Sequence, residues 1–142
     1  MGGTVFDLTK IEHTYAPPFS SAKDPVAVAG YVAGNIVTNR MPVFHWREMQ
    51  TLNPDEVTIL DVRDKIELLD GFIQSAKHIP LDDLRERLHE IPKDKPVYIY
   101  CAAGLRGYLA LQILTQRGYK DVKNLSGGYE TYRIASYNQR KD

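Results

Sequence analysis

The chain has 142 residues, of which 43% are apolar, and its 18 basic and 18 acidic side chains give a formal net charge of zero. This length and apolar content suffice for one core but not for a second large domain. The interspersed charges exclude a field that would attract nucleic acid or an anionic membrane, and the single cysteine excludes an internal disulfide framework. With no stretch that resembles a membrane span or a signal peptide, we expect a cytoplasmic protein.

The first forty residues carry a proline-rich segment and then one helix. Short apolar runs alternate with turn formers, and two consecutive prolines force an extended or turning backbone. Asp24 followed by proline is typical of a helix start, and apolar residues at helical spacing predict a helix from 25 to about 38. Gly30 and Gly34 would each cost an isolated helix about 1 kcal/mol relative to alanine. This helix therefore requires close packing against another surface, and the sheet of its own domain is one surface that it could cover.

Strands and helices alternate through the rest of the chain, which predicts a parallel sheet covered on both faces. The expected strands are an edge strand with Val43, Phe44 and Trp46, followed by 58–62, 77–79, 97–100 and 122–125. The expected helices are a short turn at 46–52, then 81–91, a helix that starts between 104 and 108 and ends before Gly118, and 129 to about 137. The fold class is therefore α/β, with a central parallel sheet of about five strands.

The only cysteine, Cys101, lies where the expected strand 97–100 ends and a helix follows. In a parallel sheet, ligands bind at the carboxyl ends of the strands. A helix N-terminus, the loop amides and the guanidinium of Arg106 all favour negative charge, so we expect a thiolate near neutral pH. Four small or flexible residues allow successive N–H groups to turn toward the sulfur: Ala102, Ala103, Gly104 and Leu105.

Such a loop can hold a persulfide, a thiosulfate or a tetrahedral oxyanion, so its residue types leave the reaction class open. Its length narrows the choice, because Cys-dependent phosphatases place five residues between cysteine and arginine. Only four separate Cys101 from Arg106, and this smaller cradle suits sulfur better than phosphate. The alternative interpretations are a buried hydrophobe for Cys101 and a solvated cation for Arg106, and we favour the functional ones.

Two motifs, in the right order, resemble a known family. CAAGLRG, its helix and VKNLSGGYETY are similar to the active-site half of rhodanese-like (sulfurtransferase) domains. TILDVRDKIELLDGFIQSAKHIPLDDL resembles that family's first pattern, although Phe72 stands where many members carry histidine. The resemblance spans roughly residues 42 to 136 and implies a rhodanese-like fold. It also implies that Cys101 takes a sulfane sulfur from a donor, holds it as a persulfide and passes it to a thiol or another nucleophile.

The resemblance assigns roles to other residues. Ala102 to Arg106 would bind the substrate around Cys101, and the family usually employs the residues that correspond to Asp61 and Arg63 to tie loops together. We therefore expect a supporting role for Asp61 and Arg63. No metal is expected, because the histidines at positions 13, 45, 78 and 89 lack metal-ligand spacing. No general base is needed, since a preformed thiolate attacks a sulfane sulfur directly.

A further resemblance concerns the segment YAPPFSSAKDPVAVAGYVAGNIVT. It is similar to the end of the dimerisation domain of FAD-dependent pyridine nucleotide-disulfide oxidoreductases, especially CoA-disulfide reductases, some of which carry a rhodanese domain next. We thus expect residues 1–40 to be such a tail and 41–142 to be the rhodanese-like domain. The chain has no G-x-G-x-x-G and no second cysteine, so FAD, NAD(P)H and CoA are expected only in a parent reductase.

The same resemblance bears on partners. A parent flavoprotein, a partner flavoprotein or a homodimer would cover the apolar face of the helix from 25 to 38. In the reductases a tyrosine of this tail can approach the partner's active site, which makes Tyr15 a candidate, although a packing role explains it equally well.

Two other functions stay open. A phosphatase or arsenate reductase on the same scaffold is disfavoured by the length of the loop. A non-catalytic module that regulates or dimerises a partner is an alternative, because a loop that looks reactive need not turn over.

Overall fold

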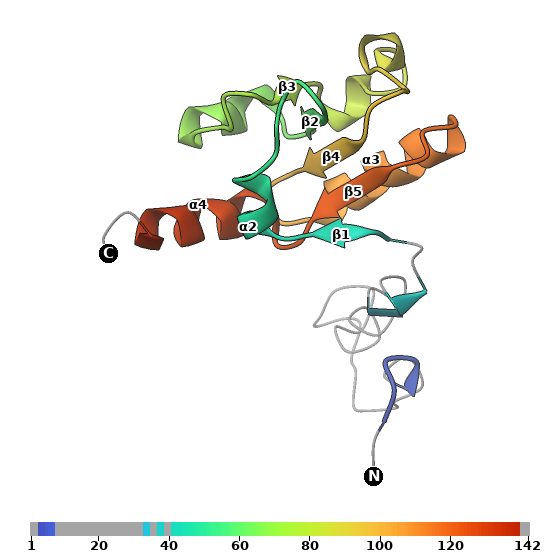
Figure 1. The fold of residues 1–142 in the computed structure, drawn as a ribbon, viewed down its shortest axis with the longest axis vertical. Helices are drawn as coiled ribbons and strands as arrows, with labels where there is room; N and C mark the ends of the chain where they lie inside the picture. Colours follow the sequence, from blue (N-terminus) through green and yellow to red (C-terminus); the bar gives the residue numbers. More distant parts are fainter. Residues whose placement is uncertain (1–2, 8–32, 35–36, 39–40, 140–142) are drawn as a thin grey trace, which may run out of the picture. The chain divides into compact units, whose positions relative to one another are not determined.

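The structure, a computed structural model, describes residues 3–7, 33–34, 37–38 and 41–139. The chain divides into two compact units, Met1–Met41 and Pro42–Asp142 (Figure 1). Tyr15 and most of the expected helix 25–38 lie outside the described residues. The described parts of that helix are helical, and the N–H of Thr38 donates to the carbonyl oxygen of Gly34 at 3.0 Å.

Gly34 lies close to Phe6 within the first unit. A Cβ added to Gly34 would lie 3.1 Å from Cε1 of the Phe6 ring, so the ring takes the space that a larger side chain would need. Close packing at Gly34 agrees with the expectation that this helix packs against another surface.

Five parallel strands form the sheet of the second unit, in the order β1-β5-β4-β2-β3 (Figure 1). They are β1 (Val43–Phe44), β2 (Thr58–Asp61), β3 (Lys77–His78), β4 (Val97–Tyr100) and β5 (Val122–Leu125). Ile99 of β4 pairs with Leu60 of β2 on one side and with Asn124 of β5 on the other. This confirms the expected sheet and puts the end of β4 at the centre of its carboxyl edge.

The side chains of β4 alternate between two core clusters, as the two-residue period of a strand requires. Val97 and Ile99 pack with α3 (Leu105–Gln116), while Tyr98 and Tyr100 pack with residues of α2 (Trp46–Met49) and α4 (Gly128–Gln139). All four β4 side chains are buried. Both faces of the sheet are therefore covered, which explains why this strand reads as a continuous apolar run.

The expected helix 81–91 is wrong, because this segment forms two short 3-10 turns, η4 (Leu81–Asp83) and η5 (Leu88–Glu90). Leu84 and Ile91 are buried, as the apolar spacing suggested. The Tyr119 hydroxyl lies 2.9 Å from the carbonyl oxygen of Leu88 and 2.8 Å from that of Ile91. Contacts with the rest of the fold thus satisfy the backbone here, and two single turns bury the same side chains as a helix would.

Two smaller differences precede and follow β2. Trp46 opens α2 and does not extend β1, because the backbone is extended at His45 and the N–H of Met49 then closes a helical turn onto its carbonyl at 3.2 Å. A 3-10 helix, η3 (Lys65–Asp70), was not expected. Its capping box joins Asp64 to Glu67, whose carboxylate accepts the Asp64 N–H at 2.8 Å.

Candidate active site

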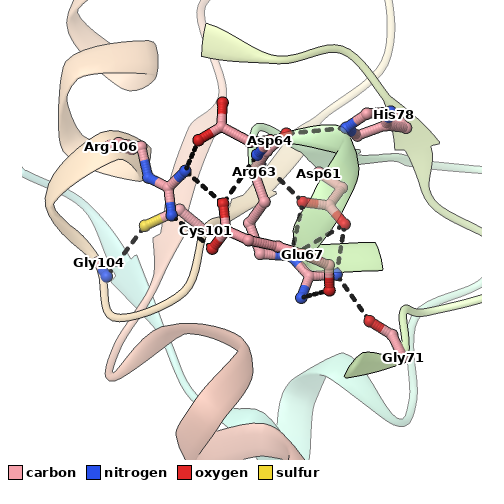
Figure 2. A network of polar contacts seen from close by, with 9 residues as sticks. All are labelled: Asp61, Arg63, Asp64, Glu67, Gly71, His78, Cys101, Gly104 and Arg106. Carbon is pink, nitrogen blue, oxygen red and sulfur yellow. Dashed lines mark hydrogen bonds and ion pairs between the residues drawn. The ribbon is translucent and has the colours of Figure 1, made fainter. Parts of the chain in front are cut away.

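Cys101 follows the last residue of β4 and begins the loop that leads into α3 (Figure 2). Its side chain is buried, with 2% exposed, and its thiol forms no disulfide. The backbone N–H of Gly104 donates to Cys101 Sγ at 3.0 Å. A donor at this distance favours negative charge on the sulfur. The structure thus places the cysteine at the junction of strand and helix, as the sequence predicted.

The N-terminus of α4 holds the carbonyl side of this loop. The N–H of Tyr129 donates to the carbonyl of Cys101 at 2.8 Å, and that of Glu130 donates to the carbonyl of Ala102 at 3.1 Å. Because the C=O and N–H of a trans peptide point in opposite directions, the amides that follow these carbonyls point away from α4. Gly128 permits the approach, since its φ is +61° and a Cβ there would collide with the Ala102 carbonyl.

Gly104 ends the loop and precedes the first residue of α3. Its φ of +127° is a conformation that residues with a Cβ rarely adopt. Its carbonyl accepts a hydrogen bond from Asn124 Nδ2 of β5 at 2.9 Å. Of the neighbouring side chains, Ala103 and Leu105 are exposed. The loop is therefore held by β5 and α4, while it presents small or apolar side chains to the outside.

Arg106, in the first turn of α3, forms ion pairs that the sequence did not reveal. Its guanidinium donates to both carboxylate oxygens of Glu67, at 2.6 and 2.7 Å, and to Asp64 at 3.2 Å (Figure 2). The hydrogen bond from Arg106 lowers the pKa of Glu67, and the pair with Glu67 raises the pKa of Arg106. Cys101 is close enough to contribute to that rise. Arg106 thus lies beside the sulfur but faces two carboxylates.

Asp61 and Arg63 form a buried pair behind the loop, with 1% and 2% of their surfaces exposed. Arg63 Nη2 contacts Asp61 Oδ2 at 2.8 Å, and Arg63 Nε contacts both Asp61 oxygens at 3.0 and 3.2 Å. The guanidinium also donates to the carbonyls of Glu67, at 3.4 Å, and Gly71, at 2.9 Å, and lies 4.2 Å from the centre of the Tyr129 ring. These contacts join β2, η3 and α4, and the supporting role of Asp61 and Arg63 stays a prediction.

Tyr100 and His78 complete the polar groups near this pair. Burial, together with the nearby Asp61 carboxylate, raises the pKa of Tyr100, whose hydroxyl accepts the N–H of Ile73 at 3.3 Å. The Nε2 atom of His78 lies 2.8 Å from the carbonyl oxygen of Arg63. Both side chains therefore hold the backbone around η3.

Two other kinds of feature are absent from the described residues. No group of three His, Cys, Asp or Glu side chains that could bind a metal ion occurs among them. Within the same residues, no helix combines the length and the apolar character needed to span a membrane.

The sequence contains one signal for Asp64 and Glu67, the two partners of Arg106 that the sequence analysis did not identify. Asp64 and Glu67 follow the Asp-Val-Arg segment with the D-x-x-E spacing of a capping box, which predicts a helix start there. It does not predict that the same glutamate would reach Arg106, which lies 39 residues further along the chain.

Two solved structures of longer chains are similar to this chain. The reduced Bacillus anthracis CoADR-RHD is 44% identical, covers 95% of this chain and has a TM-score of 0.87. The NAD-dependent persulfide reductase from A. fulgidus is 36% identical, covers 91% of this chain and has a TM-score of 0.74. This chain spans only 24% of the first and 23% of the second.

A shorter relative and a family model match the second unit. The sulfurtransferase of Allochromatium vinosum is 42% identical over 74 residues, which are 52% of this chain and 69% of that protein. The sequence model described as Rhodanese-like domain matches residues 46–135. The enzyme class expected from the sequence, a rhodanese-type sulfurtransferase, is confirmed by these matches. Since the family model covers more than half of the chain, the chain belongs to the rhodanese-like domain family.

Proposed function

We propose that this chain carries sulfane sulfur as a persulfide on Cys101 and passes it to a thiol or another nucleophile. The observation that supports this most directly is the buried sulfur at the carboxyl edge of the sheet, with the Gly104 amide 3.0 Å away. Such a donor stabilises negative charge on the thiolate before transfer and on the persulfide after it. The loop from Ala102 to Arg106 would surround the bound donor.

The chemistry consists of two displacements at sulfur. The Cys101 thiolate attacks the outer sulfur of the donor, a new S–S bond forms, and the donor's own S–S bond breaks. Its electron pair leaves with sulfite when the donor is thiosulfate, or with a thiolate when the donor is an organic persulfide. An acceptor thiolate then attacks the outer sulfur of the persulfide and releases Cys101 as a thiolate. Charge is conserved, and neither step needs an external oxidant or reductant.

A reductase that acts on CoA-disulfide, CoA-persulfide or polysulfide is the context we propose. The similarity to Bacillus anthracis CoADR-RHD extends over 95% of this chain, which supports residues 1–40 as a dimerisation-domain tail and residues 41–142 as the rhodanese-like domain. FAD, NAD(P)H and CoA would then bind to the reductase part and not to this chain. The parent flavoprotein would be the partner, and a homodimer would form through the tail. We place the protein in the cytoplasm, where a single cysteine stays reduced.

A non-catalytic module is the alternative function. A phosphatase or arsenate reductase fits less well, because α3 begins at Leu105 and only four residues lie between Cys101 and Arg106. This spacing leaves a smaller cradle than the phosphate loops have.

Turnover distinguishes an enzyme from a non-catalytic module. With cyanide as acceptor and thiosulfate or an organic persulfide as donor, we expect thiocyanate to form catalytically with the wild type and not with Cys101→Ser. Thiocyanate formation that persists in Cys101→Ser would contradict the role of Cys101. A wild type that turns over no sulfane donor would favour the non-catalytic module.

A further inference from the structure

Arg106 is the only charged side chain in the loop from Cys101 to Arg106, and its guanidinium already has acidic partners. Both carboxylate oxygens of Glu67 contact it, at 2.6 and 2.7 Å, and Asp64 contacts it at 3.2 Å. A bidentate pair of this kind fixes the plane of the guanidinium as well as neutralising its charge. An anion at Cys101 therefore meets an arginine whose charge is largely compensated.

Acidic groups outnumber basic ones beside the loop. The helix η3 and its cap, residues 64–70, carry three carboxylates and one lysine. The buried Arg63 adds no uncompensated cation, because Asp61 pairs with it at 2.8 Å. Thiosulfate is a dianion, so the loop amides and the N-terminus of α3 attract it while the carboxylates of η3 repel it.

Apolar side chains project from the same two elements. Ile66 precedes Glu67 in η3, and Leu105 precedes Arg106 in α3. An organic donor can bury apolar surface against such side chains, whereas thiosulfate has none to bury. Four large apolar side chains of η3, of the loop after it and of the first residue of α3 are 72%, 82%, 54% and 73% exposed, respectively: Ile66, Leu69, Phe72 and Leu105.

We propose that Glu67 determines donor specificity by holding the charge of Arg106 away from the donor, so that the site favours organic persulfides over thiosulfate. The favoured donor class is an organic persulfide whose part next to the sulfur is uncharged and partly apolar. This inference rests on the proposed persulfide chemistry of Cys101. Glu67 is a positioning residue, because it acts on the donor through Arg106.

Glu67→Gln tests this role without removing the cap of η3. Glutamine at this position still accepts a hydrogen bond from the Asp64 N–H, so the fold should be retained. The readout is the rate at which Cys101 gains one sulfur atom, followed by intact mass at increasing donor concentration. We expect the thiosulfate concentration that gives the half-maximal rate to fall about tenfold, because Arg106, no longer paired with a carboxylate at position 67, can turn its charge toward the dianion. With N-acetylcysteamine persulfide, whose body is uncharged, we expect a change of about twofold at most.

Two further variants separate this effect from general changes of charge. Glu90→Gln is the matched control, since Glu90 also pairs with an arginine, Arg87, in a different part of the fold. Glu90→Gln should leave the half-maximal concentrations of both donors unchanged. Arg106→Ala should weaken thiosulfate binding more than it changes folding. Adding Glu67→Gln to Arg106→Ala should lower the half-maximal thiosulfate concentration about twofold at most, because Glu67 can no longer act through Arg106.

The outcomes distinguish a failure of this inference from a failure of the proposed function. If the ratio of the half-maximal concentrations of the two donors does not change in Glu67→Gln, Glu67 does not determine donor specificity. If Glu67→Gln still improves thiosulfate binding tenfold in the absence of the Arg106 side chain, Glu67 does not act through Arg106. If the wild type accepts sulfur from neither donor, the proposed persulfide function is wrong, and this inference, which rests on it, is wrong as well. If the wild type does accept sulfur and Glu67→Gln shows no shift, only the inference fails.

Discussion

Arg63 and Asp61 are charged groups that the fold buries together. Loss of the Arg63 side chain would leave the Asp61 carboxylate buried without its cationic partner, which lies 2.8 Å away. Breaking a buried pair costs about 3–5 kcal/mol, so Arg63→Ala should lower the free energy of unfolding by about 3 kcal/mol in urea. Arg87→Ala is the control, because it removes a solvent-accessible, only partly buried pair with Glu90 and should change stability little. Equal stabilities of the two variants would contradict the supporting role.

At the residue scale, local pattern explains what the sequence could predict. Cys101 and its loop were found because strand, small residues and helix follow one another directly along the chain. The partners of Arg106 were not found, since Glu67 and Asp64 lie 39 and 42 residues earlier and only the folded sheet brings them close. Pairing over such separations depends on strand order, which a single sequence does not give.

At the scale of elements, α4 shapes the active-site loop. Gly128 has a φ of +61°, and a Cβ there would collide with the Ala102 carbonyl that the N-terminus of α4 holds. Gly128→Ala should therefore displace the loop, lower the free energy of unfolding by about 1–3 kcal/mol and slow the persulfidation of Cys101. Stability is measured in urea and the rate by intact mass.

Gly118→Ala is the matched control for this prediction. Gly118 also has a positive φ, +87°, but the nearest atom to an added Cβ is Lys93 Nζ at 3.9 Å. The control should lose stability through backbone strain and keep its rate of persulfidation. A Gly128→Ala variant that reacts at the wild-type rate would show that α4 does not set the shape of the loop.

The same scale shows which elements a sequence can predict. The strands β2 and β4 and the helix α3 were predicted because each has an apolar run or a helical apolar period with clear ends. The helix 81–91 was wrong, although Leu84 and Ile91 are buried as expected, because two 3-10 turns satisfy the same pattern. Apolar spacing reports which side chains face the core, and it does not fix the hydrogen bonds of a short segment.

At the scale of the whole molecule, the division at Met41 separates the first unit from the unit that contains the sheet. Since the two units are compact by themselves, a truncation that starts near Arg40 should keep its fold and its sulfur transfer. Urea unfolding and thiocyanate formation by the truncated and full chains provide the comparison. A loss of several kcal/mol, as expected for removal of a core helix, would instead make the tail an integral layer of the domain.

The central claim, that Cys101 carries the sulfur, is tested most directly by the intact mass of the full chain after exposure to a sulfane donor. We predict one added sulfur atom on the wild type, its removal by cyanide, and no addition to Cys101→Ser. An adduct that survives in Cys101→Ser, or a wild type that gains no sulfur from either thiosulfate or an organic persulfide, would contradict the account.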